Sequence, residues 1–235
     1  MRTHGIHRFF SLLCLPLSLV VTALPAAAQT GPQPSEAALF MGLHAAAHKG
    51  DSVQIERLVA GKADLNARDS NGRTPLHVAT FARQRDAIRA LVKAGADIHL
   101  QENDRYDAVT IAAVANDEEI LRVLLSLGAS AGQVTSRYDG TAFIASAHLG
   151  HDGVVRQLIA ANAPLDHVNN LHRTAVIESI VLGNGGPRHQ ATLKALIQAG
   201  ANLQLPDRSG NTPLALARSH GYPEMITMPE ESGAR

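Results

Sequence analysis

Apolar residues recur at helical spacing between residues 39 and 228, in short groups separated by polar turns. Residues 109–115 form one such group and residues 118–126 form another, with Ile120, Leu121 and Leu124 at the spacing of a helix core face. A single pair of such short helices cannot bury its apolar faces alone. The pattern therefore predicts helix pairs that stack side by side around one continuous elongated core.

The clearest unit begins with the run N-G-R-T-P-L-H at residues 71–77 and closes with G-A-D at residues 95–97. Thr74 can cap a helix, and Pro75 suits the first helical turn, where its missing N–H is not needed. Gly95 follows the second helix, where a left-handed backbone is wanted.

Two markers repeat in register with this unit. Positions equivalent to Thr74 are Met41, Asp107, Thr141, Thr174 and Thr212, and the closing alanines are Ala63, Ala96, Ala129, Ala163 and Ala201. The steps between the first set are 33, 33, 34, 33 and 38 residues, and a period of about 33 residues with this T-P-L-H start resembles the ankyrin repeat. The resemblance implies an all-α repeat solenoid of about six repeats, including degenerate caps at both ends.

The expected repeats cover residues 39–71, 72–104, 105–138, 139–171, 172–209 and 210–228. Asp107 replaces threonine as a helix cap, and Asn162 replaces the closing glycine. The long step reflects an insertion at 184–188, for which we expect a flexible loop. Residues 29–38 predict an extended linker. Pro229 is expected to end the last helix, leaving 229–235 as a polar tail.

Residues 1–28 predict a cleaved secretory signal peptide. Arg2 and Arg8 supply positive charge, residues 9–23 are apolar, and Ala26-Ala27-Ala28 forms an A-x-A cleavage pattern. The alternative is an uncleaved membrane anchor, but the run is short for spanning a bilayer and prolines interrupt it. We expect cleavage after Ala28 and a periplasmic mature protein, with secretion as the alternative and no membrane insertion after cleavage.

Composition limits the possible functions. Formal net charge is zero, so no electrostatic footprint indicates binding to nucleic acid or anionic membranes. Aromatic residues make up 3% of the chain and tryptophan is absent, which suits a thin solenoid core better than one large core. The only cysteine, Cys14, lies in the predicted signal peptide, so the mature chain has no thiolate nucleophile and no disulfide.

Enzymatic motifs are absent from the sequence, which has no G-x-S-x-G, no P-loop and no H-E-x-x-H. His44, His77 and His151 occupy positions at which ankyrin repeats use structural histidines. The resemblance implies that the ring of His77 bridges Thr74 and the neighbouring backbone. The alternative from another class is a hydrolase or metal-binding protein that uses His148, His151, His167 and His172. A zinc site needs three or four converging ligands, and their spacing predicts none. We expect no catalytic, cofactor-binding or metal-binding residues.

The resemblance implies a non-enzymatic protein–protein interaction module, in which hairpin tips and the first helices of the repeats form a concave side. On this surface we expect aromatic and cationic side chains to contact a partner: Arg73, Phe81, Tyr106, Arg137, Tyr138, His148 and Arg173. Alternatively, the tyrosines cover the backbone of the next repeat. We expect a monomer that binds an unidentified envelope or exported protein; the alternative is an exported effector that binds a host or competitor protein.

Overall fold

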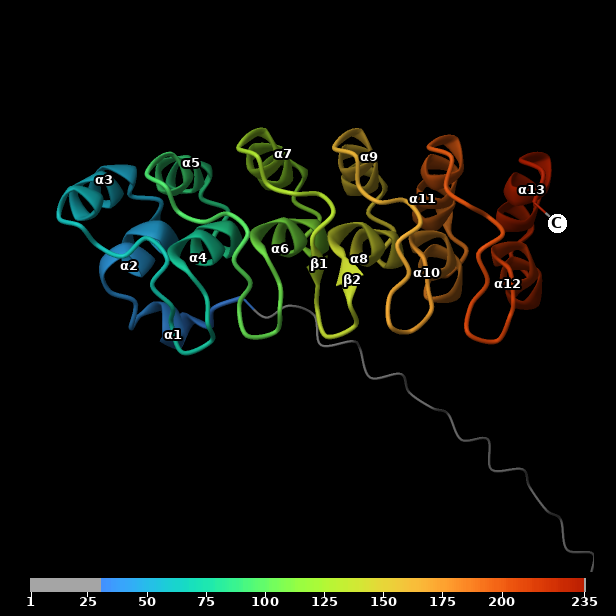
Figure 1. Cartoon of the computed structure of the whole chain (residues 1–235), viewed down its shortest axis with the longest axis horizontal. Helices are drawn as coiled ribbons and strands as arrows, with labels where there is room; N and C mark the ends of the chain where they lie inside the picture. The colour runs from blue at the N-terminus through green and yellow to red at the C-terminus, as the bar shows by residue number, and fades with distance from the viewer. Residues whose placement is uncertain (1–30, 235) are drawn as a thin grey trace, which may run out of the picture.

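The computed structural model describes residues 31–234, which form an elongated row of helix pairs joined by hairpin loops (Figure 1). The predicted signal peptide lies outside the described residues. The helices run in chain order: α1 Pro34–Ala37, α2 Gly42–Lys49, α3 Ser52–Ala60, α4 Pro75–Phe81, α5 Arg85–Lys93, α6 Ala108–Val114, α7 Glu118–Ser126, α8 Ala142–His148, α9 Asp152–Ala160, α10 Ala175–Val181, α11 Pro187–Gln198, α12 Pro213–His220 and α13 Pro223–Glu231. Strands β1 Val134–Thr135 and β2 Gly140–Thr141 form one antiparallel hairpin.

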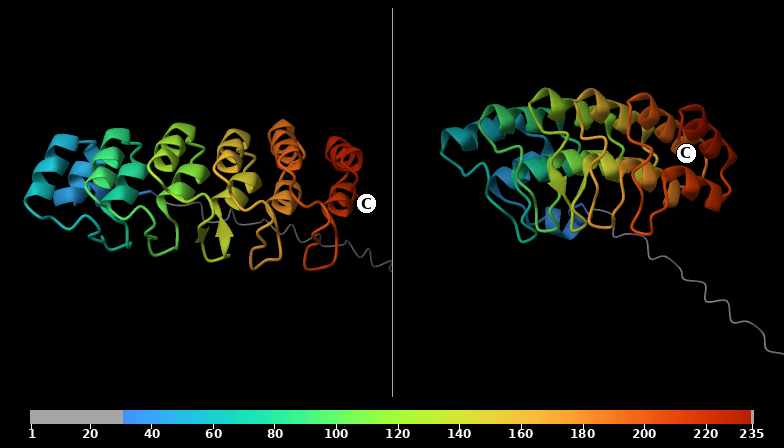
Figure 2. Two further views of the ribbon diagram at one scale, coloured as in Figure 1. Left: turned by 45° about the horizontal axis from the view of Figure 1, so that its top comes forward. Right: turned by 45° about the vertical axis from the view of Figure 1, so that its right-hand side comes forward.

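The helices form two rows. The inner row, α2, α4, α6, α8, α10 and α12, packs helix against helix, and each inner helix also packs on the helix that follows it in the chain. These following helices form the outer row. The hairpin loops all project on the side of the inner row away from the outer row (Figures 1 and 2). The predicted all-α repeat solenoid is therefore confirmed.

Inner helices begin where the sequence predicts. The side-chain oxygen of Thr74 accepts a hydrogen bond from the His77 backbone N–H, and Asp107 accepts one from Thr110 in the same way. Thr141, Thr174 and Thr212 repeat this arrangement. Each cap satisfies one backbone donor that the first helical turn leaves without a partner, so the repeated threonine sets the start of each unit.

Outer helices end in a residue with left-handed backbone. Gly95 has φ 102°, while Lys62 and Asn162, which replace glycine at the equivalent positions, both have φ 60°. A left-handed residue turns the chain back toward the next hairpin. Asn tolerates this conformation better than most residues with a side chain, and Lys tolerates it less well.

The core is one continuous apolar layer between the two helix rows. Ile55, Ile88, Leu121 and Leu158 come from successive outer helices and are fully buried. Phe143 is the largest fully buried side chain in the described part of the chain. Within residues 31–234, no helix has the length and apolar character needed to cross a bilayer.

The N-terminal segment differs from its prediction. Instead of an extended linker throughout, residues 34–37 form helix α1. The Gln33 backbone N–H donates to the Glu36 carboxylate at 2.8 Å, and Pro34 takes the first helical position. Both features stabilise a helix start, so the proline that suggested an extended chain instead begins a helical turn.

Two further expectations are wrong in part. Within the insertion, Pro187 and Arg188 belong to α11 because Pro187 occupies its first turn, where proline fits. The remaining loop is held by a side chain of α11, since Gln190 Nε2 donates to the Gly185 carbonyl at 2.7 Å. Helix α13 also continues through Pro229 to Glu231. Pro229 costs the helix the hydrogen bond that residue 229 would donate, but the helix continues beyond it, and the Ser232 N–H donates to the Met228 carbonyl at 3.3 Å.

Candidate functional site

The hairpin tips and the C-terminal ends of the inner helices form a surface that we call the hairpin face. Neighbouring hairpins are joined by backbone hydrogen bonds: Asn103 N–H donates to the Asn71 carbonyl at 3.1 Å, and Asn170 N–H donates to the Tyr138 carbonyl at 2.9 Å. These bonds hold the tips of successive repeats in one row. All seven residues predicted to contact a partner belong to hairpins or to inner-helix ends.

Three of the seven, Arg73, Phe81 and Tyr106, line one cavity of about 210 Å³ on the hairpin face of repeats two and three. We call this cavity the groove. Phe81 is the last residue of α4, and Tyr106 precedes α6. The structure therefore brings together residues from two repeats. Burial raises the pKa of the half-buried Tyr106 hydroxyl, and the Asp104 carboxylate nearby adds to the effect.

Arg73 is not displayed at the hairpin tip as expected, since only 4% of its side chain is exposed. Its Nε donates to an Asp69 carboxylate oxygen at 2.7 Å, and its Nη2 lies 3.4 Å from a Glu36 oxygen. Burial alone would raise the pKa of Asp69, but the hydrogen bonds from Arg73 lower it below its usual value. The phenyl ring of Phe40 lies 5.9 Å from the guanidinium carbon. Other residues of the chain, Glu36, Asp69 and Phe40, therefore cover Arg73, which was predicted to contact a partner.

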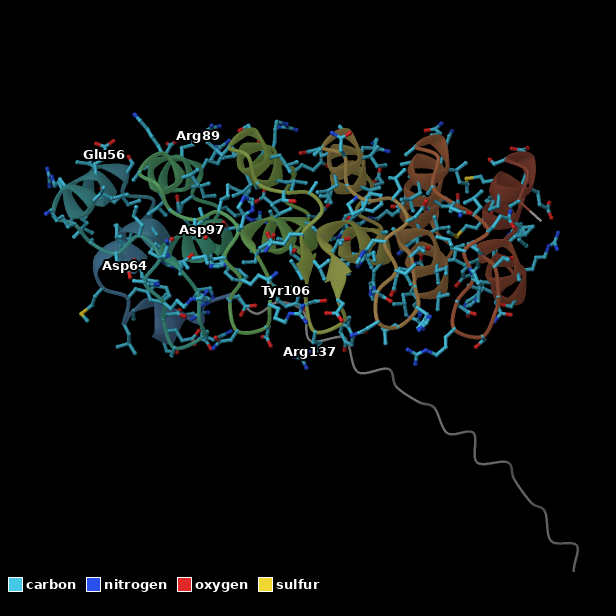
Figure 3. The ribbon with its side chains drawn as sticks, viewed as in Figure 1. Glu56, Asp64, Arg89, Asp97, Tyr106 and Arg137 are labelled. Carbon is cyan, nitrogen blue, oxygen red and sulfur yellow. The ribbon has the colours of Figure 1, made fainter. Side chains whose placement is uncertain are left out.

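Arg137 and Tyr138 lie at the tip of the β1–β2 hairpin, which joins repeats three and four. The side chain of Arg137 is 66% exposed, and its Nη2 lies 3.1 Å from an Asp104 oxygen on the preceding hairpin. Tyr138 is 43% exposed, so it does not serve mainly as a cover for the next repeat. Figure 3 shows Tyr106 and Arg137 along the hairpin row, opposite Glu56 and Arg89 on the outer helices.

His148 and Arg173 meet at a third position, around the buried carboxylate of Glu178. His148 Nδ1 lies 3.5 Å and Arg173 Nη1 lies 3.8 Å from Glu178 Oε2, while Asn169 Nδ2 donates to Oε1 at 3.1 Å. Among the described residues, Oε2 has no partner with hydrogen-bond geometry. A buried carboxylate without full pairing is costly, so this cluster places an incompletely paired acidic group inside the inner helix row.

Several other histidines join backbone segments that are far apart in the sequence. His77 Nδ1 accepts from the Thr74 backbone N–H at 3.0 Å, and its Nε2 lies 3.0 Å from the Leu100 carbonyl of the next hairpin. The predicted bridge of His77 is confirmed. Three more rings lie 2.7 to 2.9 Å from a distant backbone carbonyl: His44 at Arg73 and His151 at Ala113 reach a neighbouring repeat, and His167 reaches Asp139 at the start of its own repeat. Within residues 31–234, no three histidine, cysteine or acidic side chains are grouped to hold a metal ion.

Comparison with known proteins agrees with this architecture. The family model described as "Ankyrin repeats (3 copies)" matches residues 40–102 and 109–207, which is well over half of the chain. The chain belongs to the ankyrin-repeat family. Ankyrin repeats are protein–protein interaction modules, so the hairpin face is the surface on which a partner is to be sought.

Relatives of similar length share this ankyrin architecture. The ankyrin repeat protein YahD of Escherichia coli (strain K12) is 32% identical over 190 residues, which covers 80% of this chain and 94% of YahD. An ankyrin repeat domain from Acinetobacter baumannii is 41% identical with a TM-score of 0.77, covering 82% of this chain and 98% of that one. A chain from the complex of the Bdellovibrio bacteriovorus endopeptidase Bd0816 with immunity protein Bd3460 is 25% identical, with a TM-score of 0.68 and coverage of 82% and 98%.

Two residues of the ankyrin hairpin face were missed in the sequence. Glu178 occupies an inner-helix column in which repeats two and three have Val78 and Ile111. A charged residue at a register position that is apolar in other repeats could have predicted this cluster, because a buried ion requires polar partners. Glu36 gave less warning, since it precedes the first recognisable repeat and its partners Asn71 and Arg73 lie more than 30 residues away.

Proposed function

We propose that this ankyrin-repeat protein is a non-enzymatic binding module of the bacterial periplasm, which holds an envelope or exported protein against its hairpin face. The observation that carries the proposal is the pair of exposed hairpin tips at the ends of repeats three and four. Tyr138 and Leu171 are exposed by 43% and 39% there, next to the exposed guanidinium of Arg137. Aromatic and arginine side chains of this kind commonly anchor protein interfaces.

The rigid spacing of the tips supports binding of a folded protein surface. Arg105 and Asp139 pair at 2.9 Å, and Arg137 and Asp104 pair at 3.1 Å, so two ion pairs cross between the same two hairpins. Each exposed pair contributes little stability by itself. Together with the backbone bonds between hairpins, they limit the movement of Tyr138 and lower the entropic cost of binding.

The compartment is inferred from the first 28 residues, whose charged, apolar and A-x-A segments follow the order of a secretory signal. A solved complex of an endopeptidase with an immunity protein contains a chain of similar fold. That complex makes an envelope enzyme a reasonable class of partner to test first. Cell fractionation tests the compartment: release by osmotic shock supports it, and accumulation in the culture supernatant would instead support an exported effector.

Affinity capture from a periplasmic extract tests the binding function. The bait is the mature chain, residues 29–235, beside a variant with Tyr106, Arg137 and Tyr138 changed to alanine. We expect a protein that the wild-type bait retains and the variant loses. Thermal unfolding of both baits checks that the variant remains folded, because Tyr106 is half-buried.

A matched control changes three residues on the outer helices, Val53, Glu56 and Arg89, to alanine. All three are exposed. Glu56 and Arg89 lie on the opposite side of the solenoid from the hairpin tips (Figure 3), and Val53 is on the same outer helix as Glu56. The control should retain the partner as well as the wild type does. Equal loss from both variants would place the contact elsewhere, and no specific protein in any lane would contradict the proposed function.

A further inference from the structure

Residues 31–36 lie against the hairpin face at the groove. Gly31 packs on the ring of Phe81 so closely that an added Cβ atom would lie 3.2 Å from Phe81 Cδ1. Gly31, Gln33 and Glu36 line the groove together with Tyr106. The segment therefore crosses from the first repeat to the end of α4, as the chain entering α1 in Figure 1 shows.

Glu36 anchors the other end of this segment. Its Oε1 accepts from Asn71 Nδ2 at 2.9 Å, and its Oε2 lies 3.4 Å from Arg73 Nη2. The Gln33 backbone N–H and then the Asn71 amide lower the pKa of the Glu36 carboxyl, so it is ionised at neutral pH. The segment uses an acidic anchor and a small residue packed on an aromatic ring, which are contacts that a separate peptide could also make.

We propose that the wall of the groove formed by Asn71, Arg73 and Phe81 is a binding site for a partner segment that carries one carboxylate, and that residues 31–36 cover this wall in cis. A partner segment would place a carboxylate on Arg73 and Asn71 and a small residue or proline on Phe81. This inference rests on the proposed binding function. It adds that the chain's own segment must leave before the partner can enter.

Charge on the rest of the groove restricts the partner further. Glu102 and Asp104 line the groove beyond Phe81, and Asp104 already pairs with Arg137. Acidic residues that reach this end would meet like charge, which is unfavourable. The matching segment therefore carries its carboxylate at one end and uncharged or basic residues at the other, as Gly31-Pro32-Gln33 does before Glu36.

The fraction of time for which residues 31–36 cover the site determines how much they weaken the binding of a ligand added in trans. A site that is open for about one tenth of the time binds its ligand about tenfold more weakly than the same site held open. Substitutions that weaken the cis contact should therefore raise affinity for a ligand added in trans. This direction is unusual, because substitution of a residue that a partner contacts lowers affinity.

The probe is a fluorescent peptide with the sequence of residues 29–38, titrated by anisotropy against the mature chain, residues 29–235. Glu36→Arg places a second cation beside Arg73 and should release the cis segment. Glu56→Arg is the matched control, because Glu56 is exposed on α3 and away from the hairpin face. We expect Glu36→Arg to bind the peptide about tenfold more tightly than the wild type and Glu56→Arg.

A second variant, Gly31→Trp, keeps Glu36 but cannot place its side chain between the backbone and Phe81, and it should raise peptide affinity in the same direction. The peptide that carries Glu36→Arg should lose binding to both. Two results would overturn the inference. One is equal peptide affinity for the wild type and the variants. The other is the absence of saturable peptide binding to both Glu36→Arg and Gly31→Trp. Circular dichroism confirms that each variant is folded.

The peptide titration needs no partner, so its outcome is independent of the proposed function. If capture succeeds, the Glu36→Arg bait should retain more of the captured protein than the wild type. Unchanged retention would refute competition at the groove and leave the binding function intact. Failure of capture together with tight peptide binding would refute the proposed partner while supporting the groove.

Discussion

Replacement of His77 by asparagine should make the free energy of unfolding depend less on pH between pH 6.5 and 4. The Thr74 backbone N–H can only donate, so the His77 Nδ1 that receives it at 3.0 Å carries no proton in the folded protein. Nε2–H then donates to the Leu100 carbonyl. Burial lowers the pKa of His77 from 6.5 to about 4, although the Leu100 hydrogen bond acts in the opposite direction.

Proton linkage gives the direction and the size of the change in the free energy of unfolding that His77 contributes. Between pH 6.5 and 4 the unfolded chain binds a proton at His77 and the folded chain does not, so the free energy of unfolding falls as pH falls. The contribution is fully present above pH 6.5 and is lost by pH 4. At about 1.4 kcal/mol per pH unit, the interval corresponds to about 3 kcal/mol.

The assay is urea unfolding of the mature wild type and the His77→Asn variant at a series of pH values from 7 to 4. Other groups contribute to acid sensitivity in both proteins, including His151, whose pKa burial also lowers. The difference between the two profiles therefore isolates residue 77. The variant should be less stable at pH 7, and the gap should narrow by about 3 kcal/mol toward pH 4. If the free energies of unfolding of the two proteins change in parallel with pH, His77 is not a buried, neutral imidazole in the folded protein.

Three further outcomes can be checked by chemical denaturation. Leu124→Ala should lower the free energy of unfolding by about 2–5 kcal/mol, because Leu124 is fully buried. The control Leu39→Ala changes an 80% exposed residue and should alter the free energy of unfolding little. Similar losses from both substitutions would contradict the packing of repeat three. Lys62→Gly should raise stability by about 1 kcal/mol, because Lys62 holds φ 60°, and an equal gain from Lys62→Ala would argue against backbone strain. Glu178→Ala should lower stability by about 1–3 kcal/mol because Asn169 loses a buried acceptor, and no loss would show that water replaces the carboxylate.

Much of the fold was predictable because its signals are local. A capping threonine and the residue whose N–H it accepts are three positions apart, as in Thr74 and His77, so the repeat register can be counted along the chain. The core position of Leu124 follows from the same register and is confirmed. The partner-contact residues were harder to predict, because exposure depends on segments outside the repeat: Arg73 follows the repeat pattern of a hairpin residue, yet Glu36 buries it.

The family, the period and the helix starts were determined by the sequence itself, since capping, left-handed turns and apolar spacing act over a few residues. Only the tertiary structure decided which side chains share a site. Glu178 meets His148 across 30 residues of chain, and Gly31 meets Phe81 across 50. Neither pairing is encoded in local spacing, because both arise when one repeat, or the segment before the first, packs on another.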